Sequence, residues 1–168
     1  MIEKLEKRQH VVNSSGVERR TEEGDAFAAL AIRVLMTAGH LTAAGDALTK
    51  PLGQSSARWQ VLAGAAQGTL SVAQIARTLG VSRQAVQRLA DLLEADGLAE
   101  YADNPAHQRA KLLALTRRGR EVLDAIRARQ TVWANALGAE MSEAELCQAR
   151  VVLDKVLALL KARNSVAD

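Results

Sequence analysis

Residues 71–98, SVAQIARTLGVSRQAVQRLADLLEADGL, decide the fold of this 168-residue chain. They begin with a capping box, because Ser71 and Gln74 are spaced to satisfy each other's free backbone amides. A short helix follows and ends at Gly80, since glycine adopts the left-handed conformation that closes a helix. Ser82 then caps a longer helix, which ends in the same way at Gly97. Two helices separated by a turn of about three residues predict a helix-turn-helix.

The second of these helices has two chemically different faces. Its apolar stripe is Val86, Leu89 and Leu93, and its opposite face carries Gln84, Gln87, Arg88 and Asp91. Glutamine pairs with adenine and arginine with guanine in the major groove, so this face is suited to reading bases. Ser82 and Arg83 lie at the helix N-terminus, where a hydroxyl, a guanidinium and free amides hold a phosphate. The alternative interpretation is an ordinary polar helix surface.

A basic hairpin is predicted after this helix. Leu98–Ala102 and Lys111–Leu115 have the length of strands and flank Asp, Asn and Pro residues that favour a turn. Arg109 and Lys111 lie at or near its tip. Residues 71–120 contain eight Lys/Arg and five Asp/Glu, so this block carries all of the formal net charge of +3. A charge run usually marks a solvated face, but its coincidence with a helix-turn-helix favours binding to double-stranded DNA.

Long apolar helices flank the central block. The first is expected from Thr21 to about Leu48, one is capped by Thr116, and the last opens with a capping box at Ser142. The stripes proposed to mediate dimerisation are Phe27, Leu30 and Val34 in the first helix and Leu146, Leu153, Val156, Leu157 and Leu160 in the last. Such stripes need a partner to bury them, and a symmetric homodimer is the commonest solution. Packing within one chain is the alternative.

The predicted fold class is therefore mostly α with a small two- or three-stranded β wing (α+β), a winged helix-turn-helix with a helical dimerisation region. Low aromatic content, four residues in all, agrees with a mostly helical protein. The predicted organisation is an extension at 1–20, a dimerisation helix at 21–50, the DNA-binding domain at 51–116 and C-terminal dimerisation helices at 117–168.

Several other classes are not expected. The charged start has no secretion signal, and the apolar stretch Ala26–Leu41 is shorter than the roughly 20 residues of a membrane span. The lone Cys147 fits a reducing compartment, so a cytoplasmic protein without a membrane segment is expected. The three histidines (His10, His40 and His107) and Cys147 have no ligand-like spacing, so neither a metal site nor a cofactor is expected.

Two functions are considered as alternatives to DNA binding. An enzyme is not expected, because the chain has no GxSxG, phosphate loop, HExxH or nucleotide fingerprint. The other rival is a helical interaction module that keeps a winged helix as a protein dock. Gln84, Gln87, Arg88 and Arg109 argue against it, because a dock needs no base-reading groups.

Five motifs in order resemble the MarR family of bacterial transcription factors over about residues 21–163. They are RWQVL (58–62), IARTLGVSRQAVQRL (75–89), LLEADGL (92–98), RAK (109–111) and LTRRGR (115–120). The resemblance implies a homodimer of interleaved first, fifth and sixth helices, with a winged helix-turn-helix on each side that binds an inverted repeat. It also implies a repressor that a small aromatic effector releases from DNA, although no residue identifies that ligand.

The chain departs from the family pattern in the wing. Family wings usually carry Asp-x-Arg, whereas this chain has His107-Gln108-Arg109, which keeps the arginine but replaces the acid. Some relatives sense peroxide through cysteines near the first helix; because Cys147 lies in the last helix, a structural or inert role is expected for it.

Overall fold

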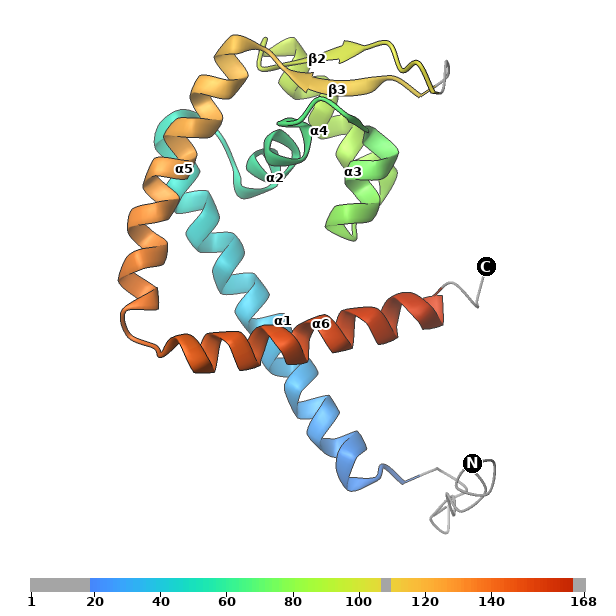
Figure 1. The fold of residues 1–168 in the computed structure, drawn as a ribbon, viewed down its shortest axis with the longest axis vertical. Helices are drawn as coiled ribbons and strands as arrows, with labels where there is room; N and C mark the ends of the chain where they lie inside the picture. The colour runs from blue at the N-terminus through green and yellow to red at the C-terminus, as the bar shows by residue number, and fades with distance from the viewer. Residues whose placement is uncertain (1–18, 107–109, 165–168) are drawn as a thin grey trace. The chain divides into compact units, whose positions relative to one another are not determined.

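The computed structural model describes residues 19–106 and 110–164, which form two compact units. One unit covers residues 1–44 and the other residues 45–168. Helix α1 (Glu22–Thr49) runs across the boundary between them. The elements that follow are coloured from teal to red in Figure 1.

The first unit consists, in its described part, of most of helix α1. The Thr21 hydroxyl caps the helix by accepting from the Gly24 amide at 3.1 Å. Acidic residues in the first turn also stabilise this end, because they face the positive end of the helix dipole. Glu22–Leu52 is long and apolar enough to cross a membrane by length and composition, a test that core helices of soluble proteins also pass.

The second unit begins where the end of α1 packs on helix α2 (Ser56–Ala65). Gly45 is buried, and a Cβ atom there would lie 2.7 Å from the Ser56 hydroxyl. Asp46 accepts from the Ser56 amide at 2.6 Å. The short 3-10 helix η1 (Lys50–Leu52), which contains Pro51, connects the two helices, so α1 ends at Thr49, close to the predicted end at about Leu48.

The helix-turn-helix is formed by α3 (Val72–Leu79) and α4 (Arg83–Ala95). Gly80 has the positive φ of 69° predicted for a helix stop, and the Val81 amide donates back to Ala76 at 3.1 Å. The Ser82 hydroxyl accepts from the Ala85 amide at 3.2 Å, which confirms the predicted N-cap. Helix α4 ends at a second stop, where Gly97 has a φ of 68°.

A small antiparallel sheet completes the winged helix. Its strands are β1 (Leu70–Ser71), β2 (Ala99–Ala102) and β3 (Leu112–Leu115), in the order β1-β3-β2. The predicted hairpin is β2 and β3, with Tyr101 opposite Leu113, and it extends beside α4 in Figure 1. Strand β1 makes the wing three-stranded.

One hydrophobic core joins these elements. Its most buried large side chains are Leu62 from α2, Ile75 from α3, Leu93 from α4, Leu113 and Leu115 from β3, and Leu123 and Ile126 from α5 (Arg117–Gly138). Thr116 caps α5, as predicted, by accepting from the Gly119 amide at 3.0 Å. A Cβ atom on Gly119 would lie 1.8 Å from the Leu98 carbonyl oxygen, so only glycine permits this approach of α5 to the chain after α4.

Helix α6 (Glu143–Asn164) follows α5 and opens with the predicted capping box. Glu145 accepts from the Ser142 amide at 2.8 Å, and the Ser142 hydroxyl accepts from the Glu145 amide at 3.3 Å. The bond from the Ser142 hydroxyl lowers the pKa of Glu145 from its usual value. The predicted fold class, a mostly helical winged helix-turn-helix, is confirmed.

Candidate nucleic-acid interface

The exposed face of α4 carries most of the predicted DNA-binding residues. Arg83, Gln84, Gln87, Arg88, Asp91 and Leu92 line one open, shallow surface along this helix. Ser82, Arg83, Gln84 and Arg88 are exposed, while Gln87 is half-buried. This face therefore presents guanidinium and amide groups from successive turns of one helix, the chemistry that reads base edges in a major groove.

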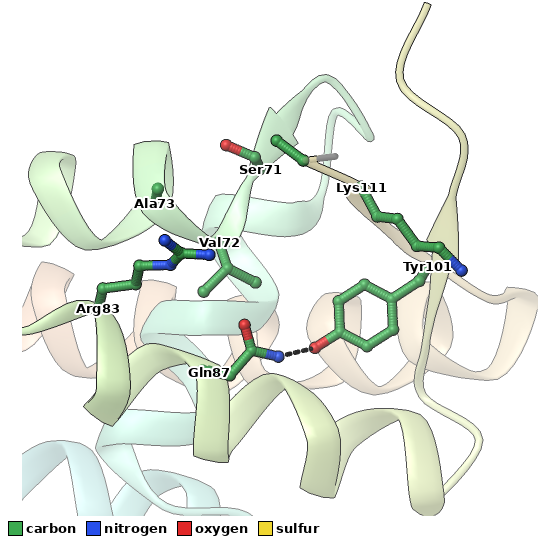
Figure 2. A pocket seen from close by; sticks show the side chains of 8 residues that line it. Ser71, Val72, Ala73, Arg83, Gln87, Tyr101 and Lys111 are labelled. Atoms are coloured by element: carbon green, nitrogen blue, oxygen red, sulfur yellow. Dashed lines mark hydrogen bonds between the residues drawn. The ribbon is translucent and has the colours of Figure 1, made fainter. Parts of the chain in front are cut away.

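A hollow of about 340 Å³ adjoins this face, between the start of α3, α4 and the wing (Figure 2). Its lining includes Ser71 and Val72, where α3 begins, together with Arg83 from α4 and Lys111 beside β3. The two cationic side chains come from different elements, and the N-terminus of α3 adds partial positive charge. This arrangement is suited to an anion such as a DNA phosphate.

Gln87 is held by two partners within the protein. Its amino group donates to the Asp91 carboxylate at 2.8 Å. It also donates to the Tyr101 hydroxyl at 2.7 Å (Figure 2). The Tyr101 hydroxyl in turn donates to the same Asp91 oxygen at 2.6 Å. Burial and the neighbouring Asp91 raise the pKa of Tyr101 well above its usual value, so the phenol keeps its proton.

Sequence reasoning did not identify Tyr101 as part of this surface. It lies 14 residues after Gln87 on another element, and strand β2 brings it beside α4. A tyrosine that packs on a core usually finds a hydrogen-bond partner for its hydroxyl, but this general rule does not say which residue the partner is.

The wing contributes one predicted residue within the described part of the chain. Lys111 is exposed and lines the hollow. Asn104 holds the two sides of the wing turn together, because it donates to the Ala110 carbonyl at 2.9 Å and accepts from the Ala106 amide at 3.0 Å. Arg109 and His107, the other residues singled out in the wing, lie outside the described residues.

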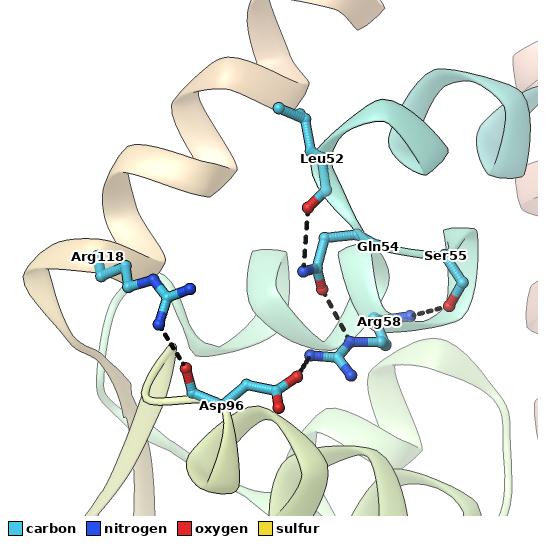
Figure 3. Close-up of polar contacts among 6 residues, drawn as sticks. All are labelled: Leu52, Gln54, Ser55, Arg58, Asp96 and Arg118. Carbon is cyan, nitrogen blue, oxygen red and sulfur yellow. Dashed lines mark hydrogen bonds and ion pairs between the residues drawn. The ribbon is translucent and has the colours of Figure 1, made fainter.

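Two arginines of the quoted motifs hold the end of α4 in place (Figure 3). Arg58 of α2 forms an ion pair with Asp96 and also donates through Nε to Gln54 at 2.8 Å. Arg118 of α5 donates to the Asp96 carbonyl at 3.1 Å. Part of the basic run that the sequence assigned to DNA binding therefore makes contacts within the protein.

Other chemistry is not indicated at this surface. Within residues 19–106 and 110–164 no three His, Cys, Asp or Glu side chains are grouped so that they could hold a metal ion. Cys147 on α6 is exposed.

The fold and this surface define a winged helix-turn-helix protein of the DNA-binding class. The sequence profile of the MarR family matches residues 54–110, which run from just before α2 into the wing. The chain is 41% identical over 140 residues to the uncharacterised protein Rv2011c of Mycobacterium tuberculosis, covering 83% of this chain and 98% of that one. The chain belongs to the MarR family of transcriptional regulators.

Solved structures share the fold. The MarR family transcription regulator SP03579 superposes with a TM-score of 0.70 at 25% identity, covering 83% of this chain and 95% of that one. A mutant of MarR from E. coli, crystallised in complex with operator DNA, gives a TM-score of 0.69 at 21% identity, covering 82% of this chain and 99% of that one.

Proposed function

We propose that this regulator is a repressor that binds an inverted-repeat operator as a homodimer and is released by a small aromatic effector. Sequence-specific DNA binding is supported above all by the exposed face of α4, where Gln84 and Arg88 flank the half-buried Gln87. The cationic hollow beside that face supplies a phosphate contact, and phosphate contacts fix the position of a recognition helix on the duplex.

Dimer formation is supported by apolar side chains left uncovered in a single chain. On α1, Phe27 is 48% and Val34 38% exposed, while Leu30 is half-buried. On α6 the exposed members of the predicted stripe are Leu146, Leu153, Leu157 and Leu160, and Val156 is half-buried. Patches of this kind usually mark an interaction surface, and a second copy of the chain would cover them.

The test of DNA binding compares one selected duplex with a scrambled duplex of the same length, by fluorescence anisotropy at several salt concentrations. We expect roughly a thousandfold or greater preference for the selected site and a steep loss of affinity as salt rises, because lysine and arginine displace condensed counterions. Equal affinity for both duplexes would contradict sequence-specific regulation.

Family membership supports three further parts of the proposal, which are a small aromatic effector, a cytoplasmic location and the absence of catalysis. Titration of the protein–DNA complex with small phenols and aromatic acids should release the duplex for at least one of them. The protein is expected in the cytoplasm, without enzymatic activity. A dock for another protein, the alternative function, predicts no salt-dependent retention on duplex DNA.

A further inference from the structure

The orientation of the Gln87 side chain is fixed by the chemistry of its partners. The Asp91 carboxylate has no proton to give, so the amide must turn its amino group toward Asp91. The Tyr101 hydroxyl gives its proton to Asp91 at 2.6 Å, so its oxygen is an acceptor toward Gln87. Both partners therefore select the same orientation of the amide.

The three groups form a closed triangle with sides of 2.6, 2.7 and 2.8 Å. The amino group of Gln87 is one corner, and the carbonyl oxygen points away from Tyr101 (Figure 2). Tyr101 is itself fixed, because its ring packs against the hydrophobic core and its strand is paired with β3. The side chain of Gln87 is thus held by the wing as well as by its own helix.

A glutamine held in this way reads bases differently from a free glutamine. Bidentate pairing with adenine needs the amino group and the carbonyl oxygen together, because adenine presents one acceptor and one donor in the major groove. A carbonyl oxygen alone accepts from any exocyclic amino group, and in the major groove both adenine and cytosine carry one. Guanine and thymine present acceptors at the corresponding positions.

We propose that Asp91 and Tyr101 set the base preference of this regulator by leaving Gln87 its carbonyl oxygen alone, so that it selects adenine or cytosine over guanine or thymine. This inference rests on the proposed function, since it concerns how the same α4 face reads DNA. Tyr101 and Asp91 are positioning residues that act through Gln87.

The test first locates the base pair that Gln87 reads. Binding sites are selected from random duplexes with the wild type and with Gln87→Ala, and the two sets are compared. The position at which the variant loses the base preference of the wild type is the position that Gln87 reads. Four duplexes that differ only at this position are then titrated. We expect the wild type to bind the adenine and cytosine duplexes within about twofold of each other, and both at least about fivefold more tightly than the other two.

The variant Asp91→Ala/Tyr101→Phe frees the amino group and keeps the aromatic ring that packs on the core. We expect it to prefer adenine over cytosine by about fivefold or more, because the bidentate pair then becomes available. Glu94→Gln is the matched control: it removes one negative charge from the same helix, so it raises affinity on all four duplexes without changing their order. Thermal unfolding establishes that each variant is folded.

Two results would overturn the inference. One is a wild type that already prefers adenine over cytosine by about fivefold, and the other is a double variant with the same order of preference as the wild type. Either result, obtained with a protein that still distinguishes its selected site from scrambled DNA, leaves the proposed function standing. A wild type that binds all duplexes equally contradicts the proposed function and this inference together.

Discussion

Among single residues, Arg83 and Arg88 occupy different parts of the candidate interface. Arg83 lines both the α4 face and the cationic hollow, whereas Arg88 lines the α4 face but not the hollow. We therefore predict that Arg83→Ala weakens binding by a similar factor on all sequences and lowers the salt slope by about one, as loss of a phosphate contact does.

Arg88→Ala, in contrast, should cost about 1–3 kcal/mol on the selected site and much less on scrambled DNA, because a base contact is lost. Titrations of both variants on both duplexes at three salt concentrations measure these effects. Uniform weakening by Arg88→Ala would assign that arginine to a phosphate instead.

The ion pair between Arg58 and Asp96 is predicted to stabilise the fold. The Arg58 side chain is 16% exposed, so removing its partner leaves a largely buried guanidinium with one bond fewer. Asp96→Ala should lower the free energy of unfolding by about 1–2 kcal/mol.

Asp124→Ala is the control for Asp96→Ala, because the Asp124–Arg127 pair is exposed on both sides. It should change stability by less than about 0.5 kcal/mol. Urea denaturation of the two variants measures both free energies of unfolding. Equal losses of stability would mean that Arg58 finds other hydrogen-bond partners when Asp96 is removed.

The sequence predicted which side chains lie on the α4 face, because helical periodicity places them there. It did not predict what Gln87 contacts, since Tyr101 comes from a strand and its position depends on how the hairpin packs against α4. Local periodicity carries no information about a pair of this kind.

At the level of elements, Gly119 fixes the junction between the recognition helix and α5. We predict that Gly119→Ala destabilises the protein by about 3 kcal/mol, because the new methyl group would collide with the Leu98 carbonyl and backbone must shift.

Gly138→Ala is the matched control in the same helix, since nothing lies within 4 Å of a Cβ atom there. It should stabilise the protein by up to about 1 kcal/mol through helix propensity. Calorimetry measures the stability of both variants. A Gly119→Ala variant as stable as the wild type would show that the junction can accommodate the methyl group.

Element boundaries were predicted well where a polar cap marks them, as at Ser82, Thr116 and Ser142. The sequence also predicts a helix from about Ser56 to Gln67, but α2 ends at Ala65, and Gly68, with a φ of 65°, follows in the turn after it. Strand β1 has two residues and exists through pairing with β3, so no periodic signal could place it.

For the whole molecule, the proposed dimer should depend on the apolar side chains of α6. Leu157→Glu introduces a charge at a 52% exposed position of the predicted stripe, so it should produce a monomer that loses tight binding to the inverted repeat. Gln148→Glu adds the same charge at an exposed polar position of α6 and should remain dimeric. Light scattering measures the mass of each protein in solution. A wild type that is monomeric at working concentration would contradict the proposed homodimer.

The start of α5 is bonded to three consecutive residues that follow the recognition helix. The Arg118 side chain donates to the Asp96 carbonyl at 3.1 Å, the Thr116 hydroxyl to Gly97 at 2.8 Å and the Thr116 amide to Leu98 at 3.1 Å. There is also no space for a Cβ atom on Gly119, so the backbone of α5 is in close contact with the chain that follows α4. We therefore expect the end of α4 and the start of α5 to move together as one rigid body. In the proposed regulation, an effector or a second subunit that turns α5 would also turn α4 relative to the duplex.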